Sequence, residues 1–108
     1  MNLHLTGHHL EITPAIREYV STKLRRIARH FDELIDLHAI LERERSHYKV
    51  EAGVHARGKE IFCESVDADI YAAIDALADK LDRAIIKHKE KSLEHRHTGT
   101  PLKHRAGG

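Results

Sequence analysis

The apolar positions of residues 69–91 recur at the spacing of one face of a helix. They are Ile70, Ile74, Leu77, Leu81 and Ile85. Successive members are three or four residues apart, so at 100° per residue they fall within one narrow sector. Asp69 precedes them, where its carboxylate can accept hydrogen bonds from the amides of the first turn. The pattern predicts a long helix with one buried face.

A second helical pattern begins after Thr13 and Pro14. Threonine at the N-cap followed by proline at the first helical position is a strong start signal. The apolar positions of this pattern are Ile16, Val20, Leu24, Ile27 and Phe31. They share one side of the helix and predict a second buried face.

Alternation of apolar and polar residues predicts four strands. The first covers residues 2–6, with Leu3 and Leu5 on one side, and the second covers residues 36–45. The third and fourth lie on either side of the tight-turn signal Arg57-Gly58-Lys59. The inward-facing residues of the last three strands are Leu37, Ala39, Leu41, Val50, Ala52, Val54, Ala56, Ile61, Cys63 and Ser65.

The element order is therefore β-α-β-β-β-α, and the predicted fold class is α+β. Each helix has one apolar sector to bury, so both should pack on one face of a four-stranded mixed sheet. A right-handed crossover makes the first two strands parallel, and hairpins make the others antiparallel.

The chain of 108 residues is 41% hydrophobic, which is enough for one domain and one core. We expect this domain in residues 1–91 and a flexible, basic, histidine-rich tail in residues 92–108. Cys63 is the only cysteine, which excludes an internal disulfide and suits a reducing compartment. No apolar run approaches the roughly 20 residues of a membrane span, and the N-terminus lacks a secretory signal pattern. The expected location is cytoplasmic.

Basic side chains of the helix at residues 69–91 gather on one flank. They are Lys80, Arg83, Lys87 and Lys91. Residues three and four apart meet on a helix surface, so these cations form a row that can follow a phosphate backbone. Asp75, Asp79 and Asp82 lie on the other flank. This helix alone is equally consistent with a solvated face that binds nothing.

The other helix also has a basic side. Its polar flank carries Lys23, Arg26 and His30, and its outer face carries Arg25 and Arg29. The net charge of +1 alone predicts no polyanionic partner. Positive charge is nevertheless concentrated on the two helices and the tail, whereas the middle of the chain is acidic.

Catalytic and metal-binding patterns are weak. The chain has eleven histidines, but no cysteine pair, no HExxH spacing and no glycine-rich phosphate loop. Cys63 alternates with core positions, which favours a buried thiol over a nucleophile. The side chains of Asp75, Asp79 and Asp82 are most simply a solvated helix face. We therefore expect no enzyme, no metal, no cofactor and no small-molecule substrate.

Nucleic-acid binding fits the residues better. Tyr19, Tyr48 and Tyr71 are scattered, which argues against single-strand recognition by base stacking. Two basic helix faces in one layer favour structured RNA, recognised through its phosphates and its shape.

Two segments resemble a known family. They are TGHHLEITPAIREYVSTKLRRIARHFD, from Thr6 to Asp32, and DIYAAIDALADKLDRAIIKHKEK, from Asp69 to Lys91. Both are similar to the signature halves of the ribosome hibernation-promoting factors, also called ribosome-associated inhibitors or sigma-54 modulation proteins. The resemblance extends from about Met1 to Lys91. Long members of the family carry an additional C-terminal domain, and we expect this chain to be of the short form.

This resemblance implies the same β-α-β-β-β-α fold. It also implies binding to the small ribosomal subunit, in the cleft where messenger RNA and the A- and P-site transfer RNAs lie. Translation would then be blocked by occupancy under stress or in stationary phase. Short members of the family either promote ribosome dimers or, with a longer tail, oppose them. The basic tail here is intermediate in length, which leaves both open, and we expect the dimer-promoting form. We expect a monomer when the protein is not on the ribosome. By position, the residues that would contact ribosomal RNA are Lys23, Arg26, Lys80, Arg83, Lys87, Lys89 and Lys91, with Arg25 and Arg29 as additional candidates.

Two alternatives stay open. One is a protein-interaction regulator of transcription, as the sigma-54 name implies, which would bind a protein partner without RNA and with little dependence on salt. The other is a histidine- or metal-dependent nuclease, for which His88 would be the residue to test.

Overall fold

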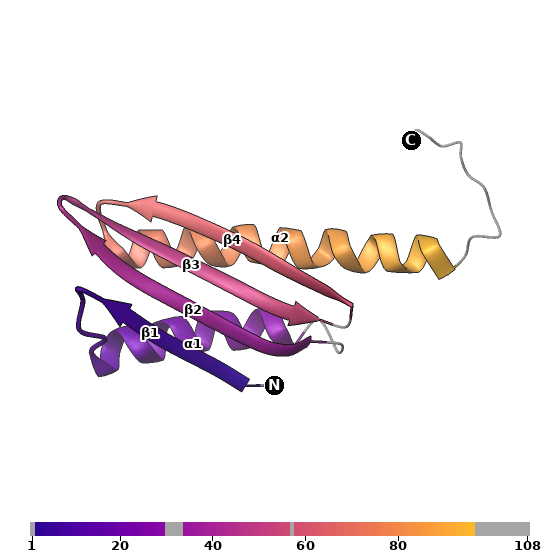
Figure 1. Ribbon diagram of the computed structural model, residues 1–108, viewed down its shortest axis with the longest axis horizontal. Coiled ribbons are helices and arrows are strands. Elements are labelled where there is room, and N and C mark those ends of the chain that lie inside the picture. The colour runs from indigo at the N-terminus through magenta and orange to yellow at the C-terminus, as the bar shows by residue number, and fades with distance from the viewer. Residues whose placement is uncertain (1, 30–33, 57, 97–108) are drawn as a thin grey trace.

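A mixed sheet and two helices make up the described part of the chain, in the predicted order (Figure 1). The computed structural model describes residues 2–29, 34–56 and 58–96, with the backbone alone for residues 34, 35 and 90–96. The elements are β1 (Asn2–His8), α1 (Pro14–Ala28), β2 (Leu34–Glu44), β3 (His47–Ala56), β4 (Lys59–Asp67) and α2 (Ile70–Arg96).

The strand order is β1-β2-β3-β4. β1 runs parallel to β2, and the β2–β3 and β3–β4 pairs are antiparallel, as predicted. Both helices lie behind the sheet in the view of Figure 1, so one face of the sheet carries the helix layer and the other is left open. The predicted α+β architecture is confirmed.

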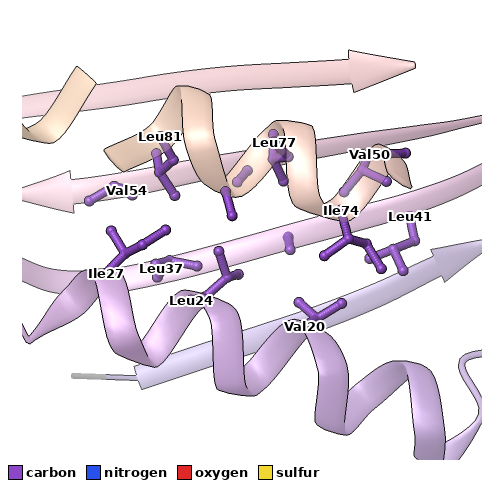
Figure 2. Close-up of a cluster of buried hydrophobic side chains, with 14 of the residues drawn as sticks. Val20, Leu24, Ile27, Leu37, Leu41, Val50, Val54, Ile74, Leu77 and Leu81 are labelled. Carbon is purple, nitrogen blue, oxygen red and sulfur yellow. The ribbon is translucent and has the colours of Figure 1, made fainter. Parts of the chain in front are cut away.

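The core lies between the sheet and the helices, and the apolar periodicities locate it correctly (Figure 2). Leu24 of α1 and Leu77 of α2 are each 1% exposed, and Leu37 of β2 is fully buried. Burying a side chain of this size contributes about 1.5–3 kcal/mol. Phe31, which was also assigned to the core, lies outside the described residues.

Both predicted helix starts have the expected caps. The Oγ1 atom of Thr13 accepts a hydrogen bond from the amide of Ile16 at 3.2 Å, and Pro14 is the first residue of α1. The Oδ2 atom of Asp69 accepts from the amide of Ala72 at 3.3 Å. Each cap satisfies a first-turn amide that has no partner within its helix.

The β3–β4 turn also follows the sequence signal. Gly58 has a φ of 73°, a left-handed conformation that glycine adopts without the steric cost of a Cβ. Arg57 of the same turn lies outside the described residues.

Three elements have boundaries that differ from the predictions. β1 continues through Gly7 to His8, because its parallel pairing with Leu41 and Glu42 of β2 keeps the backbone hydrogen-bonded. β2 begins at residue 34 rather than 36. α2 continues to Arg96, five residues past the predicted end of the helix at Lys91. Residues 92–96 contain no glycine or proline that would stop a helix. Residues 97–108 lie outside the described part.

Candidate nucleic-acid interface

The basic row of α2 lies alongside β4. Lys80 is exposed, and its Nζ donates a hydrogen bond to the backbone carbonyl of Glu64 at 2.9 Å. Lys87 lines a small hollow together with Lys59 and Glu60 of β4. This flank of α2 therefore faces the edge of the sheet and points away from α1.

One cation of this row is already neutralised within its own helix. Arg83 Nη2 lies 2.7 Å from Asp79 Oδ2, an ion pair between residues four apart. The charge pattern of the helix predicts these two side chains on separate flanks, but long side chains at this spacing reach each other over the helix surface. No described carboxylate lies within 4.0 Å of Lys87.

The basic flank of α1 faces the groove between the two helices. Lys23 and Arg26 line a hollow of about 400 Å³ together with Asp75, Asp79 and Asp82 of α2. The cationic flank of α1 therefore lies opposite the acidic flank of α2. This packing separates the two basic rows, with the three aspartates between them.

A cluster around Asp75 holds the two helices together. Lys23 Nζ lies 3.0 Å from Asp75 Oδ1, and the Tyr19 hydroxyl donates to the same oxygen at 2.7 Å. The Tyr19 ring meets the ring of Tyr71 edge to face, with centroids 5.0 Å apart, and Lys23 Nζ lies 5.4 Å from the Tyr19 centroid. Such ring pairs and cation–π contacts add stability beyond burial of area.

The same contacts shift two pKa values. The hydrogen bond from Tyr19, followed by the interaction with Lys23, lowers the pKa of the Asp75 carboxyl. The hydrogen bond to Asp75 raises the pKa of the Tyr19 hydroxyl. The expectation of a merely solvated aspartate face is therefore wrong for Asp75, which is the counter-charge of Lys23 and the acceptor of Tyr19.

Other predicted contact residues are exposed cations of α1. Arg25, Arg26 and Arg29 are all exposed, and no described carboxylate lies within 4.0 Å of any of them. Arg26 borders the interhelical groove, whereas Arg25 and Arg29 belong to the outer side of α1. Lys89 of α2 is exposed. Lys91 belongs to α2, but its side chain lies outside the described residues.

Within residues 2–29, 34–56 and 58–96, no three histidine, cysteine, aspartate or glutamate side chains are placed to hold a metal ion. No helix in these ranges is both long and apolar enough to cross a membrane. Cys63 is half-buried, and this burial raises the pKa of its thiol, as expected for a structural cysteine.

Comparison with known proteins identifies relatives of this chain. Residues 3–92 match the family described as Sigma 54 modulation protein / S30EA ribosomal protein. The ribosome hibernation promoting factor of Azotobacter vinelandii is 46% identical over 94 residues, which are 87% of this chain and 88% of the relative. Its Escherichia coli K12 counterpart is 39% identical over 95 residues, covering 88% of this chain and all of the relative.

Solved structures agree with the sequence matches. A ribosomal subunit interface protein from Coxiella burnetii superposes with a TM-score of 0.79 at 32% identity, covering 83% of this chain and 99% of that one. The N-terminal domain of Protein Y from Thermus thermophilus gives a TM-score of 0.75 at 39% identity, covering 82% and 99%.

Proposed function

Because the chain belongs to the family of sigma 54 modulation proteins and S30EA ribosomal proteins, we propose that it binds the ribosome and keeps it in a hibernating, inactive state. The domain of residues 1–91 occupies the cleft of the small subunit through which messenger RNA and the A- and P-site transfer RNAs pass. It blocks translation by occupancy and carries out no chemistry. The relatives named ribosome hibernation promoting factor support this role.

The observation that carries the RNA part of the proposal is the set of exposed cations on the helix layer. Arg26 on α1 and Lys87 on α2 have no described carboxylate within 4.0 Å. Phosphate contacts of such side chains release counterions from RNA and supply most of the affinity for its backbone.

Two other predicted contact residues, Arg83 and Lys23, already have carboxylate partners. Arg83 pairs with Asp79 at the surface, where ion pairs contribute about 0–1 kcal/mol, so its guanidinium can exchange the carboxylate for a phosphate. Lys23 is only 34% exposed and is held by both Asp75 and the Tyr19 ring. We assign Lys23 mainly to helix packing, and Arg26 and Lys87 mainly to RNA. Lys80, Lys89, Lys91, Arg25 and Arg29 complete the proposed contact set.

The test is sedimentation of purified ribosomes through a sucrose gradient with the wild-type protein or a Lys80→Glu/Lys87→Glu variant. We expect the wild type to sediment with the small subunit and to increase the ribosome-dimer peak. The variant should stay at the top of the gradient, because two like charges now oppose the phosphates. Far-ultraviolet circular dichroism should show that its fold persists, since both side chains are exposed.

The control is Arg43→Glu/Arg45→Glu, which changes the net charge equally at exposed positions near the β2–β3 turn. It should still sediment with ribosomes. Equal binding by the wild type and the α2 variant would reject the proposal. Salt-insensitive binding to a purified transcription factor without RNA would instead support the transcriptional alternative.

A further inference from the structure

The open face of the sheet carries exposed apolar side chains that the helix layer does not explain. Phe62 and Val66 of β4 are 62% and 54% exposed, although large apolar side chains are usually covered. They lie four residues apart, so both point outward from the same side of the strand. Neither helix covers this face, which is turned to the viewer in Figure 1.

Phe62 belongs to a row of side chains that crosses three strands. Gly53 of β3 is its pairing partner, and His38 of β2 pairs with Gly53 on the other side. A Cβ on Gly53 would lie only 2.6 Å from the His38 ring, so this ring lies over the glycine backbone toward Phe62. Because Gly53 has no side chain, the His38 imidazole and the Phe62 phenyl ring lie on either side of an open backbone position. We call the surface formed by His38, Gly53 and Phe62 the ledge.

Carboxylates surround this ledge. By strand alternation, the described outward-facing residues of β2, β3 and β4 include six carboxylates and one lysine. The carboxylates are Asp36, Glu42, Glu44, Glu51, Glu60 and Glu64. Lys49, the lysine, lies 3.1 Å from Glu51 and 3.8 Å from Glu64, so part of the negative charge is compensated. The excess is nevertheless clearly acidic.

We propose that the open face of the sheet, centred on Phe62, Glu64 and Val66, binds a lysine- and arginine-rich polypeptide segment that presents apolar side chains to the ledge. Positive charge on the partner complements the carboxylates, and its apolar groups cover Phe62 and Val66. RNA does not fit, because its phosphates would meet the carboxylates. Two copies joined through this face do not fit either, because both surfaces are acidic.

This inference does not rest on the proposed function, since the cations of the helix layer take no part in it. The partner is defined by chemistry alone. Phe62 and Val66 lie along one strand with Glu64 between them. A partner segment in an extended conformation can therefore place two apolar side chains over Phe62 and Val66 and a basic side chain over Glu64.

The test uses a fluorescent synthetic peptide, GKLKRKLKG, whose two leucines repeat the spacing of Phe62 and Val66. Anisotropy titrations at low salt compare the wild type with Phe62→Ser and Glu64→Lys. We expect each substitution to weaken binding about tenfold. Amide shifts in two-dimensional NMR spectra should concentrate on residues 60–66 of β4. Ile86→Ser is the matched control, because Ile86 is also an exposed apolar residue, 44% exposed, but lies on α2. It should bind like the wild type.

Three further probes separate the possible occupants. The serine peptide GKSKRKSKG should bind more weakly than the leucine peptide. A uridine oligomer should leave the side-chain resonances of Phe62 and Val66, which point away from the helix layer, unshifted. In sedimentation velocity, the wild type and Phe62→Ser should show the same association state, because copies do not associate through Phe62. The proposal is overturned if the leucine peptide does not bind, or if Phe62→Ser and Ile86→Ser bind it equally. It is also overturned if RNA shifts the side-chain resonances of Phe62 and Val66, or if copies associate through Phe62.

Discussion

Substitution of Arg26 or Lys87 by alanine should make the affinity for ribosomes depend less steeply on salt concentration. The same substitution at Lys23 or Arg83 should have a smaller effect. All four are predicted RNA contacts, but the structure divides them. Lys23 and Arg83 already have a carboxylate within 3.0 Å, whereas Arg26 and Lys87 have none among the described residues. A cation that exchanges a carboxylate for a phosphate leaves the carboxylate to recruit a new counterion, so the net ion release is small.

The structure sets the expected size of this effect. Five predicted contact residues have no described carboxylate within 4.0 Å: Arg25, Arg26, Arg29, Lys80 and Lys87. Each phosphate contact contributes about −0.7 to −0.9 to the slope of log affinity against log salt, so these five residues predict a slope of about −3.5 to −4.5. Arg26→Ala or Lys87→Ala should reduce the magnitude of the slope by about 0.8, so the affinity ratio between about 50 and 200 mM salt shrinks about threefold.

The assay is a binding titration of fluorescently labelled protein with purified small subunits over a series of potassium chloride concentrations at fixed magnesium. Lys23→Ala and Arg83→Ala should change the slope by less than half as much as Arg26→Ala and Lys87→Ala. Equal slope changes for all four variants would refute the reasoning, because they would show that the intramolecular carboxylates do not compete with RNA phosphates.

Three predictions concern stability. Leu77→Ala should lower the free energy of unfolding in urea by about 2–5 kcal/mol, because Leu77 is 1% exposed and its truncation leaves a cavity. Asp75→Asn should lower it by about 0.5–1 kcal/mol near neutral pH, because a half-exposed ion pair and its hydrogen bond from Tyr19 are weakened. Gly7→Ala should lower it by about 1–3 kcal/mol, because the added Cβ collides with the backbone carbonyl of Leu10.

The effect of Asp75 should depend on pH in one direction. Its pKa is lowered in the folded chain, so its stabilisation is complete above the pKa of the unfolded carboxyl. That stabilisation is lost as the pH falls through the lower folded pKa. Urea titrations of the wild type and Asp75→Asn should therefore converge in acid, and a difference that grew as the pH fell would contradict this assignment. Ile86→Ala, at an exposed position, is the control for Leu77→Ala and should change stability little.

Local patterns in the sequence were sufficient to determine the elements and their buried faces. The period of Ile70, Ile74 and Leu77 identifies the inner side of α2, since a helix repeats every 3.6 residues whatever it packs against. The caps at Thr13 and Asp69 are equally local, because each joins residues three apart. The end of α2 was missed because helix-forming residues continue past Lys91 without a breaker.

The arrangement of charges was decided only by the tertiary structure. Tyr19 and Asp75 are 56 residues apart in the chain, and they meet because the core fixes how α1 lies against α2. The same packing places the acidic flank of α2 against Lys23 and leaves Lys87 beside β4. Sequence periodicity gives the angle of a side chain around its own helix axis, but not the neighbour that this angle faces. For that reason the sequence identified the cations of this protein, and only the fold showed which of them already have partners.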